Sequence, residues 1–198
     1  MSKSTKVIAA LGVAAGLGVA SLPAATFAAT AQSRQVQIQA NVSESHTISV
    51  DDATKSTTNL NPGATDATLS STITIDSNNP KGYSLTVAAS GNENHVTDLW
   101  NSGASSAIAA FSSEQTTLSN ETPGWGGKLA SAYTGASGLT ATGYNGFTTT
   151  GSQVVYSSNA LASDIENEYV VNYGIALAPN QATGQYSGAV TYTLSATE

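Results

Sequence analysis

The sequence predicts an all-β protein, an antiparallel β-sandwich preceded by a short signal-peptide helix. Several segments alternate apolar and polar residues with a period of two, which is typical of strands that bury one face. Polar turns rich in Gly, Pro, Asn and Ser separate them, and no later segment carries a convincing helical pattern. Together these features favour two packed antiparallel sheets.

The N-terminus has the parts of a secretory signal. Lys3 and Lys6 precede an uncharged, Ala-rich stretch at 7–22, and small residues follow at Ala29–Ala31. We expect cleavage there, so that residues 1–31 are removed. The alternative is an N-terminal membrane anchor, but a spanning helix needs about 20 apolar residues and this stretch is short and rich in glycine.

Residues 32–198 are expected to form a single β-sandwich domain, secreted to the cell surface or cell wall. The net charge of −7 argues against nucleic acid as a partner. No second long apolar segment follows, so we expect no membrane insertion after cleavage. The chain has no cysteine, which excludes disulfides, thiolate metal sites and a lipidated Cys. We therefore expect any attachment to the cell to be non-covalent.

The first expected strand lies directly after the proposed cleavage site. Between Gln35 and Val42, four apolar residues alternate with Gln and Asn: Val36, Ile38, Ala40 and Val42. Ile48 and Val50 keep the same parity. One long strand or two strands separated by a bend would fit this pattern.

A hairpin is expected in the next part of the chain. Leu69, Ile73 and Ile75 share one parity, and the following strand carries its apolar residues at 83, 85, 87 and 89. The sequence Asn78-Asn79-Pro80-Lys81-Gly82 between them is a strong turn signal.

The region from 91 to 153 has less pattern. The run at 107–111 fits a strand or one helical turn, and the glycines at 124–127 suggest a loop. Alternation returns at 154–156 and is strongest at 169–177, before the terminal strand at 190–196.

Two short motifs resemble bacterial WxL-type cell-surface domains: Gly82-Tyr83-Ser84-Leu85-Thr86 and Val190-Thr191-Tyr192-Thr193-Leu194. That family has an early G-W-x-L strand and a terminal Y-x-x-x-L-T-W-T-L strand. Here tyrosine replaces both tryptophans, and Val190 stands where leucine is usual. The resemblance implies an Ig-like or WxL-like sandwich that binds peptidoglycan or another cell-surface component.

Three aromatic residues are candidates for wall binding. Tyr83 and Tyr192 could stack on sugar rings, but their strand parity, shared with Leu85 and Leu194, also fits a core position. Trp125, among glycines, could be presented outward by a loop or could plug one end of the sandwich.

The sequence shows no catalytic motif. His46 and His95 lie in no metal-spaced pair, and neither a nucleophile elbow nor a phosphate-binding loop is present. We therefore predict no enzyme activity, no cofactor and no metal site. Asp164, Glu166 and Glu168 could hold calcium if more oxygen ligands joined them, but a solvated acidic strand edge explains them equally well.

Two functions remain open. The first is a non-enzymatic adhesion module that associates with cell-wall polysaccharide, peptidoglycan or other surface proteins. The second is a filament or surface-layer subunit, a homo-oligomer built by strand exchange. In that case Val36, Ile38 and Val42 would fill pockets in a neighbouring copy. Against exchange stands the simpler expectation that residues 35–42 form the first strand of their own sandwich.

Overall fold

The computed structural model describes residues 37–57, 59–65, 67–92, 94–149, 153–158 and 167–198. The chain divides after Asn41, and every described strand lies in the second unit, Val42–Glu198. The expected signal peptide at 1–31 lies outside the described residues. Within the described part, no helix is long and apolar enough to span a membrane.

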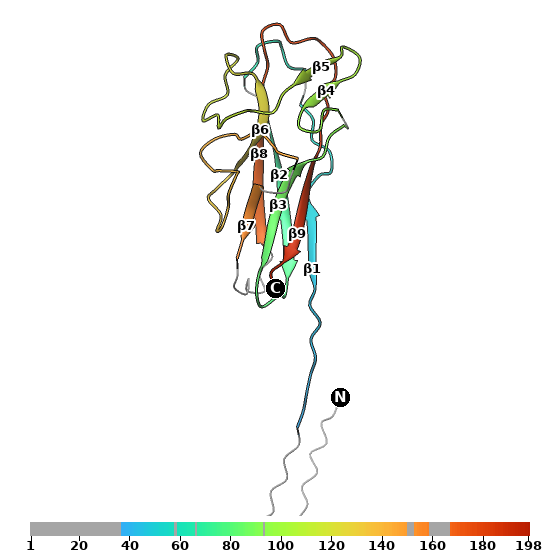
Figure 1. Ribbon diagram of the computed structural model, residues 1–198, viewed down its shortest axis with the longest axis vertical. Helices are drawn as coiled ribbons and strands as arrows, with labels where there is room; N and C mark the ends of the chain where they lie inside the picture. The colour runs from blue at the N-terminus through green and yellow to red at the C-terminus, as the bar shows by residue number, and fades with distance from the viewer. Residues whose placement is uncertain (1–36, 58, 66, 93, 150–152, 159–166) are drawn as a thin grey trace, which may run out of the picture. The chain divides into compact units, whose positions relative to one another are not determined.

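The described part of the second unit consists of strands joined by turns and loops (Figure 1). In chain order the strands are β1 (His46–Val50), β2 (Ala67–Ser77), β3 (Tyr83–Ala89), β4 (Leu99–Asn101), β5 (Ser106–Ile108), β6 (Gly124–Leu129), β7 (Gln153–Ser157), β8 (Asn167–Ala176) and β9 (Val190–Ala196).

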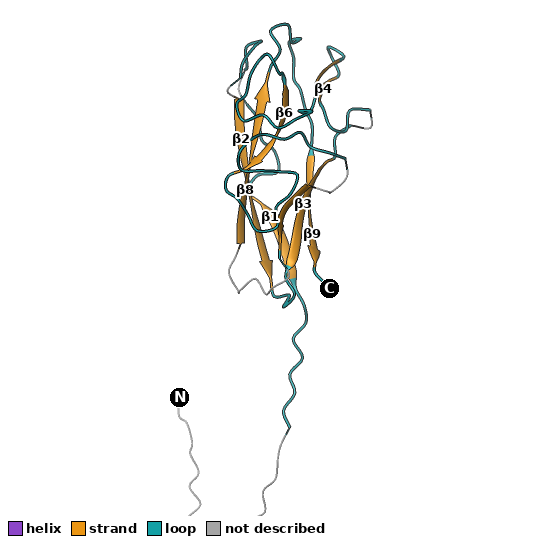
Figure 2. Cartoon of the chain, turned by 60° about the vertical axis from the view of Figure 1, so that its left-hand side comes forward, coloured by secondary structure: helices purple, strands orange, loops and turns teal. Residues whose placement is uncertain are grey.

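The strands form two main sheets, and all pairings within them are antiparallel. The first sheet has the order β1-β2-β8-β6, and the second has the order β7-β3-β9. Figure 2 shows β2 and β8 on one side and β3 and β9 on the other. A separate ladder joins β4 to β5. The predicted fold class, an all-β antiparallel sandwich, is confirmed.

The core lies between the two sheets, where the period-two pattern places it. In β2, β3 and β8 the residues of one parity are buried, and those of the other parity are mostly half-buried or exposed. The buried set from these strands includes Ile73, Ile75, Tyr83, Leu85, Val87, Tyr169, Val171 and Tyr173. Apolar burial of this kind is the main favourable term in folding.

The two motifs singled out in the sequence are neighbours in space. β3 pairs with β9 along their whole length, with Leu85 opposite Leu194 and Val87 opposite Tyr192. Opposite residues in an antiparallel pair point to the same face, so both motifs contribute to one side of the core.

The predicted hairpin of β2 and β3 is wrong. The turn at 78–82 is present, and Gly82 has a φ of 82°, which glycine adopts without steric cost. However, β2 pairs with β1 and β8, whereas β3 pairs with β7 and β9. The turn therefore carries the chain from one sheet to the other. Turn residues encode a reversal of direction, but they do not encode which strand becomes the partner.

The predicted first strand is also wrong in part. Residues 46–50 form β1, but 37–45 adopt no strand. Ile38 and Val42 are 89% and 87% exposed. An extended segment becomes a strand only where a partner accepts its hydrogen bonds, and 37–42 pair with no strand among the described residues.

Tertiary structure also resolves the ambiguous middle region. Residues 106–108 form β5, so the run beginning at 107 is partly strand and not a helical turn. The glycine-flanked Trp125 lies in β6, which is a strand and not the expected loop. The loops at 110–115 and 137–148 then fold back against β6 and β7, with bridges such as Gly127 to Asn145 and Ser137 to Val154.

Candidate functional site

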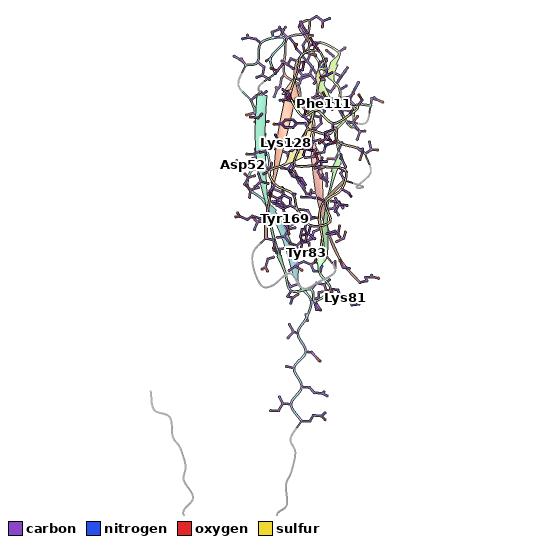
Figure 3. All side chains as sticks on the ribbon, turned by 90° about the vertical axis from the view of Figure 1, so that its left-hand side faces the viewer. Asp52, Lys81, Tyr83, Phe111, Lys128 and Tyr169 are labelled. Carbon is purple, nitrogen blue, oxygen red and sulfur yellow. The ribbon has the colours of Figure 1, made fainter. Side chains whose placement is uncertain are left out.

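Tyr83, one of the three candidate wall-binding residues, lies in the core. Its side chain is fully buried, and its hydroxyl shares a hydrogen bond of 2.6 Å with the hydroxyl of Tyr169. Figure 3 places the two labelled residues next to each other. Burial raises the pKa of both phenols, most strongly that of Tyr169. The ring therefore has no face open to a sugar.

Tyr192 also points inward. It lies on β9, is half-buried, and its hydroxyl shares a hydrogen bond of 2.7 Å with the hydroxyl of Tyr173 on β8. Burial raises the pKa of Tyr192 well above the ordinary value, and the nearby Tyr173 and Asp51 raise it further. This ring joins the two sheets and is not a surface platform.

Trp125 is 5% exposed, so of the two alternatives for its side chain the structure has the buried one. Its Nε1 donates a hydrogen bond of 2.8 Å to the carbonyl oxygen of Thr97, and its ring packs against Phe147 at a centroid distance of 5.2 Å. Buried indoles normally find such a partner for the N–H. Of the three candidate aromatic residues, Tyr83 and Trp125 are thus buried, and Tyr192 is half-buried.

The two sides of the sandwich are closed to different degrees. On the side of β6 and β7, loops cover the strands. Trp125 and Leu129 of β6 are buried, and Val155 of β7 is fully buried. On the side of β1 and β9, every residue of β1 is exposed, and the inward residues of β9 are only half-buried. We call this second side the open edge, defined by β1 and β9; these strands lie side by side in Figure 1.

Apolar residues of β1 face the interior of the open edge and are only partly covered. Ile48 lies opposite Ile75 and Val50 opposite Ile73, so they point to the same face as these two fully buried residues. Yet Ile48 and Val50 are each 37% exposed. The second sheet ends at β9, which lies next to β1, so no described strand of that sheet continues past β9 to cover the inward face of β1 fully.

The backbone of β9 is unpaired along the same edge. Thr197 donates to the carbonyl oxygen of Gly82, and Ala189 accepts from the amide of Ser90, at 3.1 and 3.0 Å. An antiparallel ladder alternates the direction of these groups, so residues 191, 193 and 195 bond to β3. The N–H and C=O of Val190, Tyr192, Leu194 and Ala196 therefore point to the free side, where β9 pairs with no described strand.

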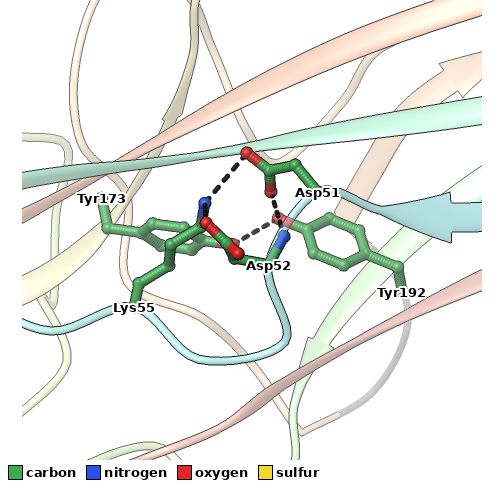
Figure 4. Close-up of polar contacts among 5 residues, drawn as sticks. All are labelled: Asp51, Asp52, Lys55, Tyr173 and Tyr192. Atoms are coloured by element: carbon green, nitrogen blue, oxygen red, sulfur yellow. Dashed lines mark hydrogen bonds and ion pairs between the residues drawn. The ribbon is translucent and has the colours of Figure 1, made fainter.

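Charged residues lie over one part of the open edge (Figure 4). Lys55 Nζ contacts the carboxylates of Asp51 and Asp52 at 2.9 and 3.2 Å. The hydrogen bond from Lys55 holds the pKa of Asp51 below its usual value, and the same contact raises the pKa of Lys55. Asp51 follows β1 directly and lies close enough to Tyr192 to affect its pKa. The part of the open edge near Tyr192 is therefore charged, and the rest of the edge is apolar.

The described candidates for strand exchange, Ile38 and Val42, are exposed to solvent. Ile38 and Val42 are the most exposed large hydrophobic residues among those described. Val36 lies outside the described residues. The first residues after Val42 are tightly held, because Asn78 accepts a hydrogen bond from the amide of Ser45 at 2.7 Å and donates one to the carbonyl of Ser43 at 2.9 Å.

The acidic residues considered for calcium and the histidine His95 form no metal or catalytic site among the described residues. Asp164 and Glu166 lie outside the described residues, and Glu168 is exposed on β8 opposite Thr74. Among the described residues no group of three or more His, Cys, Asp or Glu side chains is arranged to hold a metal ion. His95 stacks on Trp100 at a ring-centroid distance of 3.7 Å, and its Nδ1 lies 3.2 Å from Oδ2 of Asp98.

Sequence reasoning missed the open edge itself. It identified the terminal strand and its inward parity but treated both as ordinary core. One signal in the sequence could have indicated it. The alternating segment at 35–42 is a further apolar strand in a chain whose other strands are enough for two sheets.

Comparison with known proteins gives a distant structural likeness. No family model and no curated protein matches the chain. Among solved structures, it is similar to a chain of the CsuC–CsuE chaperone–tip adhesin pre-assembly complex from the archaic chaperone–usher Csu pili of Acinetobacter baumannii. The identity is 9% and the TM-score 0.42, over 78% of this chain and 40% of the other. So low a score carries no conclusion about this chain, whose fold class follows from its own strand pairings.

Proposed function

We propose that this chain is a non-enzymatic cell-surface protein that associates with other surface proteins through the open edge of its sandwich. The observation that carries the proposal is the pair of edge strands β1 and β9, where inward apolar residues are only partly covered and the strand backbone has no described partner on its free side. Exposed edges of this kind readily accept a further strand. The expected signal peptide supports export, and the acidic surface supports solubility outside the cell.

A glycan-binding module is the second candidate, and the geometry favours it less. Tyr83, Trp125 and Tyr192 were the candidates for stacking on sugars; Tyr83 and Trp125 are buried, and half-buried Tyr192 directs its hydroxyl to that of Tyr173. One open depression of about 320 Å³ is lined by Thr68, Leu69, Ser70, Lys128, Tyr144 and Asn172. Of these, Tyr144 is the single aromatic residue, and Lys128 covers its ring at 4.7 Å.

Binding to isolated cell envelopes separates the two candidates. The exported chain, beginning at Gln32, is incubated with envelopes of the producing organism, either intact or stripped of protein by protease. We expect pelleting with intact envelopes and loss of pelleting after stripping. Undiminished binding to stripped envelopes would favour the glycan candidate and contradict ours.

A matched pair of variants tests whether the open edge is responsible. Ile48→Lys places a charge on the inward face of β1, whereas Ser49→Lys places the same charge on the outward face of the same strand. Inward charges on edge strands block the addition of a further strand. We expect Ile48→Lys to abolish pelleting and Ser49→Lys to preserve it. Equal behaviour of the two variants would show that another surface binds.

A further inference from the structure

We infer that the strand completing the open edge is residues 36–42 of a second copy of this chain, so that copies join head to tail. The inference rests on the proposed function, because it names the partner of the same edge. Four observations support it: the length and period of the segment, its lack of charge, its exposure, and the hydrogen bonds that hold residues 43–45 between the segment and β1.

The period and length of the segment match those of β9. The segment from Val36 to Val42 has seven residues with an apolar residue at every second position. β9 also has seven residues, with inward side chains at Val190, Tyr192, Leu194 and Ala196. In a strand, side chains on the same face are about 6.6–6.8 Å apart. The four apolar side chains of the segment therefore have the same spacing as the four inward side chains of β9 and can face the interior beside them.

Charge favours the same pairing. The stretch between Arg34 and Glu44 is uncharged, and so is β9. The pairing itself therefore brings no charged side chain of the segment against β9; the charged residues of this edge are Asp51, Asp52 and Lys55, which lie over the part near Tyr192. Main-chain groups at positions 190, 192, 194 and 196 point away from β3 and would gain partners where the added strand lies beside them. Ile38 and Val42, 89% and 87% exposed, would gain cover, and so would Ile48 and Val50.

The fastening at Asn78 favours a second copy over the same chain. The segment at 36–42 precedes β1. To reach the open edge of its own chain it must fold back, antiparallel to β1, so the chain must reverse its direction within residues 43–45. Asn78 holds these residues in line with β1. Its backbone N–H and its amide oxygen bond to Ser45, and its side-chain N–H bonds to the carbonyl of Ser43.

The Ser45–Asn78 pairing continues the register of β1 with β2, where His46 lies opposite Ser77. Folding back would break this pairing, whereas donation to a neighbour leaves it intact. Because the donor segment and the acceptor edge are different surfaces, the contact is heterologous. Repetition of such a contact gives an open filament unless the rotation between copies closes a ring.

Complementation between two variants tests the inference on the chain beginning at Gln32. Ile38→Glu impairs the donor segment, and Gln39→Glu is its matched control on the opposite face. Ile48→Lys impairs the acceptor edge, with Ser49→Lys as control. Each protein is unfolded and refolded at high concentration, so that exchange is not trapped kinetically. Its mass is then measured by size-exclusion chromatography with light scattering, and circular dichroism confirms folding.

We expect oligomers from the wild type and from both control variants, and monomers from Ile38→Glu and from Ile48→Lys separately. An equimolar mixture of the two monomeric variants is expected to form dimers, because one keeps its acceptor and the other its donor. The apparent dissociation constant of wild-type association is expected to be lower than that of Ile38→Glu by about ten-fold or more, since the variant would bury a charge.

Several results would overturn the inference: a monomeric wild type at every concentration, a mixture of folded variants that stays monomeric, or oligomers that persist in Ile38→Glu. These outcomes are distinct from failure of the proposed function. A monomeric wild type that still pellets with envelopes in an Ile48-dependent way would leave edge binding standing with a different partner. Pelleting that is independent of Ile48 would reject the edge itself.

Discussion

At the residue scale, hydroxyl pairs between tyrosines join the two sheets. Tyr83 on β3 meets Tyr169 on β8, and Tyr192 on β9 meets Tyr173 on β8. Each pair satisfies two phenol groups that would otherwise enter the interior without a partner, and a buried polar group without a partner is costly. The tyrosines are therefore structural elements of the core, whichever partner the protein has.

Replacement of one phenol tests this role. Tyr83→Phe removes one hydroxyl and leaves that of Tyr169 buried without its partner, so we expect a loss of about 1–3 kcal/mol of unfolding free energy. Urea unfolding measures the loss. Tyr186→Phe is the control: the half-buried Tyr186 loses its donated bond to the carbonyl of Ala182 and its accepted bond from Nε2 of Gln181. It should cost less, because solvent can reach these groups. Equal costs would show that the buried pair has no special role.

The same tyrosines predict how stability depends on pH. Their pKa values are raised in the folded state, so the neutral form is favoured there, whereas in the unfolded chain they ionise near pH 10. The unfolded state therefore binds fewer protons above about pH 10, and the free energy of unfolding falls as pH rises further. Below that pH this contribution is fully present. Absorbance titration of tyrosinate should show a group that ionises only with unfolding; reversible ionisation of all tyrosines near pH 10 in the folded protein would contradict this.

At the element scale, β6 shows why glycines can form a strand. A Cβ on Gly126 would lie 2.3 Å from the carbonyl oxygen of Asn145, and one on Gly127 would lie 2.4 Å from the ring of Phe147. The loop at 137–148 can approach β6 this closely only because the glycines have no side chain. These contacts close one side of the sandwich.

Alanine substitutions test this close approach. Gly126→Ala is expected to lower the unfolding free energy by about 1–3 kcal/mol or more, because the obstructing atoms belong to the backbone of Asn145 and cannot rotate away. Gly103→Ala is the control, since its Cβ would meet nothing closer than 3.4 Å, at the Asn101 side chain. Thermal unfolding compares the two; a Gly126→Ala variant as stable as Gly103→Ala would mean that the loop moves freely.

The fastening of residues 43–45 is also a property of one element. Asn78→Ala removes both side-chain bonds to this segment. We expect the variant to let 36–42 fold back onto the open edge of its own chain, which would shift the refolded protein from oligomers toward monomers. Light scattering after refolding measures the shift. Unchanged oligomers in a folded Asn78→Ala variant would show that this fastening does not select the partner.

At the scale of the sandwich, protection from hydrogen exchange should be uneven. In the monomer, amides of Thr191, Thr193 and Ser195 bond to β3, whereas those of Tyr192 and Leu194 point to the free side. We expect fast exchange at alternate residues of β9 in monomeric Ile38→Glu, and protection of both parities in wild-type oligomers. NMR-detected exchange gives the residue resolution. Oligomers in which Leu194 still exchanges fast would place the contact elsewhere.

Much of this protein was predictable from local pattern, for one physical reason. Side chains alternate across a strand, so the sequence at 73–75, 83–89 and 169–175 predicts which face of each strand is buried without information on its partner strands. The same pattern made Tyr83 and Tyr192 as fit for a core as for a binding surface, and the burial of Trp125 could not be read from its glycine neighbours. The all-β class and the turn at 78–82 follow from properties of a few adjacent residues.

Only the tertiary structure decided which strands pair and which edge stays open. Pairing depends on groups far apart in the sequence, so the turn at 78–82 could join a hairpin or two sheets equally well. The segment at 36–42 has the period of a strand, yet a strand needs a partner for its main chain, and period alone does not show whether that partner is in the same molecule. The sequence by itself determined which faces are apolar; the packing of β1 and β9 determined that one side of the sandwich is left incomplete, because the second sheet ends before it covers the first.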